Sequence, residues 1–317
     1  MKTPLLIVNP HSGPKRTIPS LGKLLAAVEE TLGDVVVHYT THRGHAQELA
    51  ADGAREGHSL IVAVGGDGTF NEVANGVLQQ SSLDDPGAVG PTVALIDAGT
   101  GGDFRRSLGI GSGYEDCLAA ISLGRERLVD VGLASFTGND GAPVTHYFVN
   151  VLSAGLSGVV VRYVEAAPSF LGGRAAYYLS SLRGVMQGRE RRLSARVTWG
   201  ETEQERVIPT YLVAICNGGW FGGGMNVAPM ALPDDGRLEV ITVTGHSRMH
   251  LAAMLNKSYS GRHMEEPTVE HFPCTKIELS PAEDTTGGPF LLEIDGDPLG
   301  ALPLTVEILP RRLRIRA

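Results

Sequence analysis

The sequence predicts an α/β protein with an N-terminal doubly wound parallel sheet and a C-terminal β-rich sandwich domain. Three observations carry this prediction. Short apolar strands alternate with amphipathic helices before Gly132, and strand follows strand after it. In addition, 41 of the 317 residues are glycines, and several of them cluster directly after strands. A parallel sheet covered by helices on both faces produces short apolar strands of this kind.

The first half alternates strand and helix in a regular way. Ser20–Gly33 illustrates the helical pattern, because its apolar residues recur on one face and Gly33 stops the helix. The expected order is strand Leu5–Asn9, helix Ser20–Gly33, strand Val35–Thr40, helix Ala46–Arg55, strand Leu60–Val64, helix Phe70–Gln80 and strand Thr92–Ile96. Ligands of parallel sheets bind beyond the carboxyl ends of the strands, so we expect the site there.

The second half is typical of an antiparallel sandwich or barrel. The expected strands are Tyr147–Val151, Leu193–Trp199, Val207–Cys216, Leu238–Val243, Ile277–Leu279, Phe290–Ile294 and Leu304–Leu309, with one helix around Arg174–Met186. We place the domain boundary at Gly132. Residues 1–132, joined by residues 303–317, would form the first domain, and residues 133–302 the second.

Charge and cysteine content exclude several classes of protein. With 27 basic and 35 acidic residues, the net charge is −8, which argues against nucleic acid as a partner. Cys117, Cys216 and Cys274 lie far apart in the sequence, so a disulfide framework or zinc–thiolate site is not expected. No apolar run is long enough to span a bilayer. We therefore expect a cytoplasmic protein whose membrane association is peripheral.

The most informative motif is Gly65-Gly66-Asp67-Gly68-Thr69, which follows the strand Leu60–Val64 directly. Glycines allow backbone N–H groups to approach a phosphate closely. Thr69 and Glu72 form a T-x-x-E capping box, which predicts a helix start whose positive end points at the loop. An aspartate among such donors suits Mg²⁺ or a proton. The alternative is a plain strand-to-helix turn.

Two further loops lie at the same end of the predicted sheet. Gly99-Thr100-Gly101-Gly102-Asp103-Phe104 follows the strand Thr92–Ile96, and the polar turn Asn9–Gly13 follows the first strand. Neither is a G-x-x-x-x-G-K-[ST] phosphate loop. Two loops rich in Gly, Thr and Asp that flank one crevice predict a phosphate site more strongly than either alone.

These residues resemble a known family, the diacylglycerol kinase catalytic-domain superfamily, which also contains sphingosine and ceramide kinases. The chain looks most like its soluble bacterial lipid kinases, whose nucleotide-binding domain is NAD kinase- and phosphofructokinase-like. The resemblance covers residues 4–309. Its motifs are Asn9–Gly13, Thr40 with Gly44–Ala46, Gly65–Thr69 with Glu72, Gly99–Phe104 with Arg106 and Leu108-Gly109, Val129–Gly132, Asn217-Gly218 with Gly222–Met225, Ala228-Pro229, Asp234–Gly236 and Asp295–Asp297.

The resemblance implies a role for each matching residue. Asp67 and Asp130 would belong to a Mg²⁺ and water network beside the transferred phosphate. Asp295 and Asp297 occupy the catalytic D-G-E segment, where an acid accepts the lipid hydroxyl proton, although Asp-Gly is also a favoured hairpin turn. The residues that would bind ATP are Asn9, Pro10, His11, Ser12, Gly13, Thr40, Gly65, Gly66, Asp67, Gly68, Thr69, Phe70, Asn71 and Thr100. A structural metal site would use Leu232, Asp235 and Arg237, the outer two through backbone carbonyls.

Three positions depart from the family pattern. Gly102 replaces the usual Asn, Asp97-Ala98 stands where a proline is common, and Asp297 replaces the usual Glu. The last change shortens the candidate base by one methylene, and a displacement of about 1 Å can cost around 100-fold in rate. These departures bear on efficiency and on the acceptor rather than on the fold.

The function predicted from these motifs is an ATP- and Mg²⁺-dependent lipid kinase acting at a membrane surface. The first domain would hold ATP, the second the acceptor, and transfer would occur in the cleft between them. Diacylglycerol is the first choice of acceptor, and a sphingoid base or ceramide is the alternative lipid. A kinase for a soluble acceptor such as NAD, and a non-catalytic lipid- or nucleotide-binding module, are the rival classes. The sequence leaves open whether the protein is a homodimer.

Overall fold

The computed structural model describes residues 2–13, 17–81, 90–99, 101–156, 160, 163–164, 173–245, 247–283 and 288–317. The chain divides into two compact units. The first comprises Met1–Val131 and Pro310–Ala317, and the second comprises Gly132–Leu309. The first is an α/β unit and the second is β-rich, so the predicted fold class is confirmed.

The first unit is built on a parallel sheet in the order β2-β1-β3-β4, joined at β4 by the end of β17 through Ile315 and Val93. Its elements are β1 (Leu5–Val8), α1 (Thr17–Leu32), β2 (Val36–Tyr39), α2 (His45–Glu56), β3 (Leu60–Gly65), α3 (Asp67–Gln79), β4 (Thr92–Asp97), α4 (Asp103–Ser107), α5 (Tyr114–Leu123), the start of β5 (Glu126–Gly138) and the end of β17 (Asp297–Arg316).

Helices cover both faces of this sheet. Leu24 and Val28 of α1 and Leu118 of α5 share one apolar cluster with alternate residues of β1, β3 and β4. On the other face, a Cβ on Gly76 of α3 would lie 2.2 Å from a backbone oxygen of Gln47 in α2. This glycine therefore allows α2 and α3 to pack closely together.

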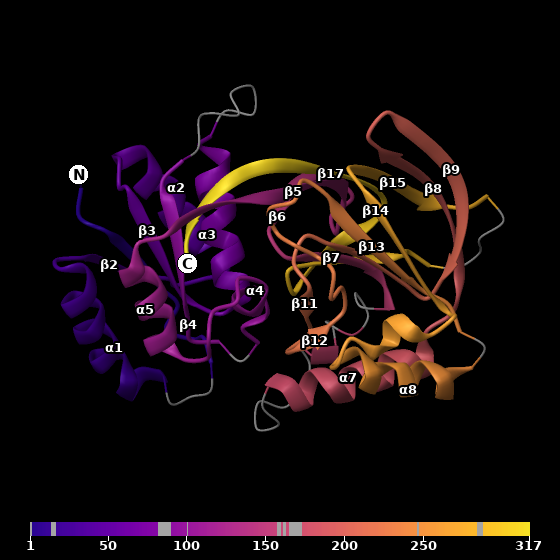
Figure 1. Ribbon diagram of the computed structural model, residues 1–317, viewed down its shortest axis with the longest axis horizontal. Helices are drawn as coiled ribbons and strands as arrows, with labels where there is room; N and C mark the ends of the chain where they lie inside the picture. The colour runs from indigo at the N-terminus through magenta and orange to yellow at the C-terminus, as the bar shows by residue number, and fades with distance from the viewer. Residues whose placement is uncertain are drawn as a thin grey trace. The chain divides into compact units, whose positions relative to one another are not determined.

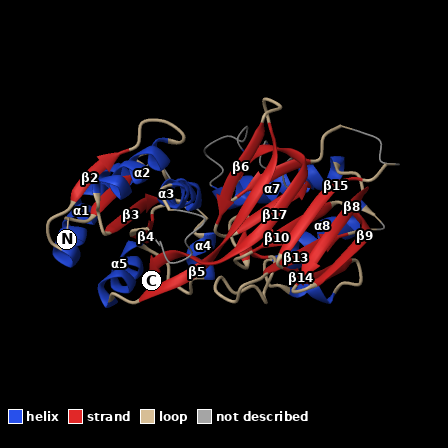
Figure 2. Ribbon diagram, turned by 90° about the horizontal axis from the view of Figure 1, so that it is seen from above, coloured by secondary structure: helices blue, strands red, loops and turns tan. Residues whose placement is uncertain are grey.

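The second unit is a sandwich of two antiparallel layers, which belong to one continuous sheet because both include the long strand β17. One layer runs β14-β13-β10-β7-β16-β17, and the other runs β9-β8-β15-β17, with β6 paired to β5. Figure 2 shows β17, β10, β13 and β14 of the first layer running alongside one another. The elements are the end of β5, β6 (Pro143–Phe148), β7 (Val151–Gly155), α7 (Gly173–Gln187), β8 (Arg191–Trp199), β9 (Thr202–Thr210), β10 (Leu212–Cys216), β11 (Trp220–Phe221), β12 (Met225–Asn226), β13 (Leu238–Val243), α8 (Arg248–Ser258), the 3₁₀ helix η2 (Arg262–Glu265), β14 (Val269–Cys274), β15 (Lys276–Pro281), β16 (Leu291–Ile294) and most of β17.

The sandwich core lies between these layers. Alternate residues of each strand, such as Ile215 in β10 and Ile277 in β15, meet in one cluster of buried side chains. The opposite face of the first layer has a second apolar cluster, which includes Val151, Phe221 and Met225. Helices α7 and α8 lie on one side of β10, β13 and β14 (Figure 2). The sandwich reading is thus confirmed over the barrel.

Several details of the secondary structure were not predicted correctly, and helices α4 and α5 and strands β5 and β14 were not expected. Helix α3 begins at Asp67 rather than Phe70. The expected strand Val207–Cys216 is divided into β9 and β10, and Tyr147–Val151 is divided between β6 and β7. Helix α8 was not expected at all. Among the described residues, none of the helices has the length and apolar character needed to cross a membrane.

Candidate active site

The carboxyl ends of β1, β2 and β3 bring three predicted nucleotide-binding segments together. The Asn9 backbone N–H donates to the Val64 carbonyl at 2.9 Å, and the Thr40 N–H donates to the Val8 carbonyl at 2.9 Å. The Asn9 side-chain amide then donates to Thr69 Oγ1 at 3.0 Å. The polar turn after β1 is therefore attached directly to the first helical turn after β3.

The two glycine loops touch through their backbones. A Cβ on Gly99 would lie 2.6 Å from the Cα of Gly66, and a Cβ on Gly66 would lie 3.4 Å from the Cα of Gly99. Gly68 is different, because a Cβ there would meet nothing within 4 Å. The glycine surplus in these loops thus serves a close approach at Gly66 and Gly99, and Gly68 leaves open space above the start of α3.

Asp67 joins the two loops through its carboxylate. Its Oδ2 accepts the Asp103 N–H at 3.1 Å and its Oδ1 accepts the Phe104 N–H at 3.0 Å, so it caps α4. Burial raises the pKa of Asp67, and the nearby Asp97 raises it further, while the two N–H donors and Arg106 oppose the shift. The carboxylate is therefore incompletely compensated by its surroundings.

Glu72 has a different partner from the one its motif suggests. Helix α3 begins after Gly66 without a side-chain cap, so the T-x-x-E capping box does not form. Glu72 Oε1 instead accepts the Gly44 N–H at 2.8 Å, and Oε2 accepts the Ala46 N–H at 3.1 Å. Glu72 therefore caps the neighbouring helix α2 and fixes the loop that follows Thr40.

Two departures from the family pattern are coupled in the structure. Gly102 has φ +63°, and a Cβ there would lie 2.2 Å from Asp97 Oδ2. Asp97 Oδ2 instead accepts a hydrogen bond from Arg105 Nε at 3.1 Å, in an ion pair shielded from solvent. Arg105 also donates to the carbonyls of Ile110 and Gly111. The absence of a side chain at position 102 makes room for this ion pair.

The remaining predicted residues of the first unit lie in varied environments. Phe70 is completely buried and stacks on Phe104 at 5.1 Å between ring centroids, and Asn71 is buried in contact with Asn75. Pro10, His11, Ser12 and Gly13 form the turn after Asn9, where the His11 N–H donates to Asn9 Oδ1 at 2.9 Å. Thr100 lies outside the described residues.

Asp130 is completely buried in β5. Its Oδ1 accepts the Arg311 N–H at 2.7 Å, where Arg311 has φ +55° in β17. The carboxylate therefore supports a bend of β17, which returns to the first unit beside β5. Its role beside Mg²⁺ stays a prediction.

In the second unit, Asp295 and Gly296 form the two-residue turn between β16 and β17. Both have positive φ, +47° and +97°, as a tight type I′ hairpin turn requires. Asp295 Oδ1 accepts the Val151 N–H at 2.8 Å and Oδ2 accepts the Val149 N–H at 3.1 Å. The hairpin reading of this dipeptide thus describes its backbone, and the turn also holds the carboxylate in one orientation.

Glu293 was missed by the sequence analysis. Its side chain is 2% exposed, its Oε1 accepts the Gly296 N–H at 2.5 Å, and its Oε2 accepts the Ser153 hydroxyl at 2.5 Å. A glutamate in an alternating strand is typical of an exposed position, so no local signal pointed to it. Glu293 fixes the hairpin that carries Asp295 and Asp297.

Two of the three residues predicted for a structural metal site form an ion pair with each other. Asp235 Oδ2 lies 2.9 Å from Arg237 Nε, and Asp235 Oδ1 accepts the Arg237 N–H at 3.3 Å. Burial raises the pKa of Asp235, and Arg237 opposes this shift. Leu232 is exposed. The Asp235 carboxylate is thus engaged with Arg237, and metal binding by these three residues stays a prediction.

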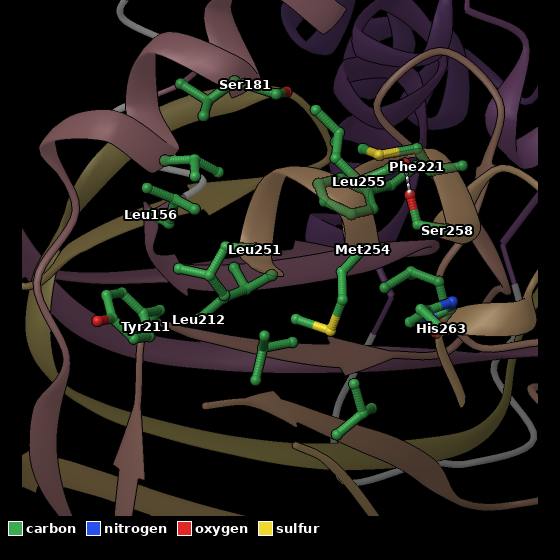
Figure 3. A pocket seen from close by; sticks show the side chains of 16 residues that line it. Leu156, Ser181, Tyr211, Leu212, Phe221, Leu251, Met254, Leu255, Ser258 and His263 are labelled. Carbon is green, nitrogen blue, oxygen red and sulfur yellow. Dashed lines mark hydrogen bonds between the residues drawn. The ribbon is translucent and has the colours of Figure 1, made fainter. Parts of the chain in front are cut away.

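An apolar cavity lies in the second unit, beneath α7 and α8 (Figure 3). Its volume is about 100 Å³. Val151, which donates to Asp295, packs in the same cluster as the cavity residues Phe221 and Met225. The lining residues are Leu156, Val160, Ser181, Val185, Tyr211, Leu212, Phe221, Met225, Val227, Val243, Leu251, Met254, Leu255, Ser258, His263 and Val269.

Known proteins match this chain along nearly its whole length. Residues 3–134 match the diacylglycerol kinase catalytic domain, and residues 150–317 match the YegS C-terminal NAD kinase beta sandwich-like domain. The chain is 28% identical to the diacylglycerol kinase of Bacillus subtilis, over 99% of this chain and 96% of that protein. It is 30% identical to a Chromohalobacter salexigens protein named "Probable lipid kinase YegS-like", over 98% of this chain and 92% of that protein.

A solved structure from Bacillus anthracis str. Sterne, of a candidate diacylglycerol kinase, has a TM-score of 0.75 and 25% identity. The match covers 99% of this chain and 97% of the chain in that structure. The fold, the two domain matches and the kinase relatives agree. The chain therefore belongs to the family of diacylglycerol kinases and YegS-like lipid kinases, and it is an ATP-dependent lipid kinase.

Proposed function

We propose that the chain transfers the γ-phosphate of ATP to the hydroxyl of diacylglycerol and so forms phosphatidic acid. The observation that supports a lipid acceptor is the apolar cavity of the second unit. Its residues Phe221 and Met225 pack in one apolar cluster with Val151 of β7, whose N–H donates to Asp295. A cavity lined almost entirely by aliphatic and aromatic side chains suits an acyl chain. The name of the Bacillus subtilis relative supports diacylglycerol as the particular lipid.

On the nucleotide side, we assign the ATP phosphates to the two glycine loops and the turn Asn9–Gly13. The loops present backbone N–H groups where little side-chain bulk intervenes, and α3 begins at Asp67 with its positive end there. Residues 1–132 with residues 303–317 would form this nucleotide domain, and residues 133–302 would form the acceptor domain.

The residues present fit a hard divalent cation such as Mg²⁺. Asp67 offers carboxylate oxygens, the ligand type that Mg²⁺ prefers, in a buried position that raises its pKa. Each oxygen accepts one backbone N–H, which leaves a lone pair on each. When bound, the cation would neutralise charge on the phosphates. Asp67 would hold the cation, and Asp130 would support β17 through the Arg311 N–H.

On the acceptor side, we assign Asp295 as the group that accepts the lipid hydroxyl proton. Phosphoryl transfer depends mostly on positioning, so the acid must be held in one orientation. The Val149 and Val151 amides hold its two oxygens in this way. Asp297 begins β17 on the far side of the turn, and we assign it to acceptor binding.

The experiment is a panel of acceptors with radiolabelled ATP and Mg²⁺. Diacylglycerol, ceramide and a sphingoid base are presented in mixed micelles, and NAD in solution. The proposal predicts labelled phosphatidic acid as the main product and none with Asp67→Ala. A main product from ceramide or the sphingoid base would overturn the choice of acceptor. Formation of NADP alone would overturn the proposal.

A further inference from the structure

Three side chains with metal-binding atoms gather where the segment after β2 enters α2 in the first unit (Figure 1). They are His42, His45 and Glu48, and one ligand atom from each lies within 4.8 Å of those of the other two. Among the residues that the structure describes, this is the one group of three or more His, Cys, Asp or Glu side chains close enough to share an ion. The proposed ATP and acceptor sites use none of the three.

The local structure explains this grouping. His45 is the first residue of α2 and Glu48 follows three residues later, so both lie on one side of the helix. His42 precedes His45 by three residues in a turn that the His45 N–H closes by donating to the His42 carbonyl at 3.3 Å. The two imidazole rings stack with their centroids 4.7 Å apart. The H-x-x-H-x-x-E pattern thus brings two imidazoles and a carboxylate together.

The hydrogen bonds of His42 leave its Nε2 for an ion. Nδ1 lies 3.0 Å from the Arg43 carbonyl, which can only accept, so Nδ1 carries the ring proton. Nε2 therefore carries the lone pair, 4.0 Å from Glu48 Oε2. Histidines that bind metals usually donate their other ring N–H to a carbonyl or carboxylate in this way, which fixes the tautomer and the ring orientation.

Thr41 orients the second imidazole. The Thr41 N–H donates to His45 Nδ1 at 3.0 Å, and the Thr41 hydroxyl lies 3.1 Å from the same nitrogen. Coordination through His45 Nε2 requires the ring proton at Nδ1, and Thr41 Oγ1 is placed to accept it. Thr41 is exposed, so water can then accept its backbone N–H.

Two carboxylates offset the positive end of α2, which by itself would disfavour a cation. Glu72 accepts the Gly44 and Ala46 N–H groups, and Glu48 adds a negative charge in the first turn. The ligand atoms around a tetrahedral zinc ion lie about 3.4 Å apart. The side chains of His42 and Glu48 are 57% and 66% exposed, so they have room to leave the ring stack and close on an ion.

We propose that His42, His45 and Glu48 bind a divalent transition-metal ion, with Zn²⁺ as the best match. Two imidazoles and a carboxylate, with water in the fourth position, are a ligand set that zinc uses in proteins. Imidazole suits zinc, whereas Mg²⁺ prefers oxygen ligands, so this site is separate from the one proposed at Asp67. The bound ion ties the turn after Thr40 to the first turn of α2. This inference goes beyond the kinase reaction and needs neither ATP nor lipid.

The experiment is isothermal titration of the protein, purified without a histidine tag, with ZnCl₂ in the absence of ATP and lipid. Excess Mg²⁺ is present to occupy sites that prefer oxygen ligands, and the three cysteines are buried. We expect one zinc ion per chain. His42→Ala and Glu48→Gln should each weaken zinc binding at least tenfold, because even the groups that orient metal ligands contribute about 10- to 100-fold to affinity.

Matched controls come from the same unit. His38→Ala removes an exposed imidazole of β2, and Glu30→Gln removes an exposed carboxylate of α1. Both should bind zinc like the parent protein. Thermal unfolding separates a lost ligand from a damaged fold. Without zinc the parent and all four variants should have similar Tm values, and zinc should raise the Tm of the parent and the two controls only.

Parent-like zinc affinity in His42→Ala and Glu48→Gln would overturn the inference. Equal losses in the His38→Ala and Glu30→Gln controls would overturn it as well. A parent protein that binds no zinc would show that His42 and Glu48 form an ion pair only, which also contradicts the proposed site.

Discussion

Asp67 in the first unit and Asp295 in the second are held in the same way by unlike structures. Each carboxylate accepts two backbone N–H groups, one on each oxygen. Asp67 receives them from the start of helix α4. Asp295 receives them from Val151 of β7 and from Val149, which precedes β7. In the first unit glycines allow two loops to touch, whereas in the second a glycine completes a hairpin turn with positive φ.

The comparison shows that glycines can help to hold a carboxylate in a fixed orientation in two different ways. Gly66 and Gly99 are needed for the space that a side chain would fill, and Gly296 for a backbone conformation that other residues adopt at a cost. Asp67 therefore depends on contacts between distant loops, and Asp295 on a local turn. The predictions below test that distinction.

The largest effect is expected from removing the proposed base. Asp295→Asn should lower kcat by about 10²- to 10⁴-fold, the usual contribution of a general base. At saturating ATP and lipid, Asp297→Asn should lower kcat less than Asp295→Asn does, because we assign Asp297 to acceptor binding. Its main effect should be a higher KM for the lipid. A greater loss of kcat in Asp297→Asn would exchange the two roles.

Next in size is the contact between the loops. Gly99→Ala places a Cβ 2.6 Å from the Gly66 Cα, so the loops must separate. We expect ATP affinity to fall at least tenfold, because a displacement of about 1 Å in a positioned site has effects of that order. Isothermal titration with ATP and Mg²⁺ measures it.

Gly22→Ala in α1 is the matched control, because nothing lies within 4 Å of a Cβ there and the residue is outside the proposed ATP site. It should keep the parent affinity and stabilise the protein slightly, by up to about 1 kcal/mol, since alanine favours helix over glycine. Equal loss in both variants would show that the close contact of the loops is not what the glycines provide.

A double-mutant cycle tests the coupling of Asp97 and Gly102. Restoring the family residue in Gly102→Asn should destabilise the protein by about 2 kcal/mol, because the new Cβ meets the Asp97 carboxylate. Asp97→Ser alone should also destabilise it by leaving the buried Arg105 guanidinium without its carboxylate partner. Urea unfolding should show the double variant to be at least about 1 kcal/mol more stable than the sum of the singles. Strict additivity would remove the proposed link between these departures.

The smallest expected effect is on the pH dependence of stability and comes from His146, a residue of the second unit. Burial lowers the pKa of His146 to about 4. The unfolded chain has an ordinary histidine pKa of about 6.5 and so binds the proton more readily, and stability falls as the pH drops from 6.5 toward 4. From pH 8 to pH 5 the expected loss is at most about 2 kcal/mol. His146→Gln should lack that part of the pH dependence in urea unfolding; an unchanged pH profile would place the proton elsewhere.

Much of the fold and part of the site follow from local patterns. The alternation of strand and helix, and the glycine loops after β3 and β4, are visible because strands and turns have short-range signals. The start of α3 was misplaced because Glu72 bonds to Gly44 and Ala46, which are distant in sequence. A capping box cannot be distinguished from such a contact by spacing alone.

The remaining misses have similar physical causes. The break between β9 and β10 depends on Thr210, whose Oγ1 accepts the N–H groups of Leu212 and Val243. Helix α8 has only a short apolar stripe of Leu251, Met254 and Leu255, which lines the cavity, and the outward-facing Met249 obscures it. Glu293 resembles any strand glutamate until burial is known. Each of these features depends on contacts between residues that are far apart in the sequence, and a local sequence pattern does not reveal such contacts.

The most direct test of the account compares ATP binding by Asp67→Asn and Asp295→Asn with that of the parent protein, each in the presence of Mg²⁺. Asp295→Asn should bind ATP like the parent and fail to phosphorylate lipid. Asp67→Asn should lose ATP affinity at least tenfold, because it weakens both the cap on α4 and the proposed Mg²⁺ ligand. Parent-like ATP affinity in Asp67→Asn together with lost affinity in Asp295→Asn would contradict the assignment of nucleotide and acceptor to the two units.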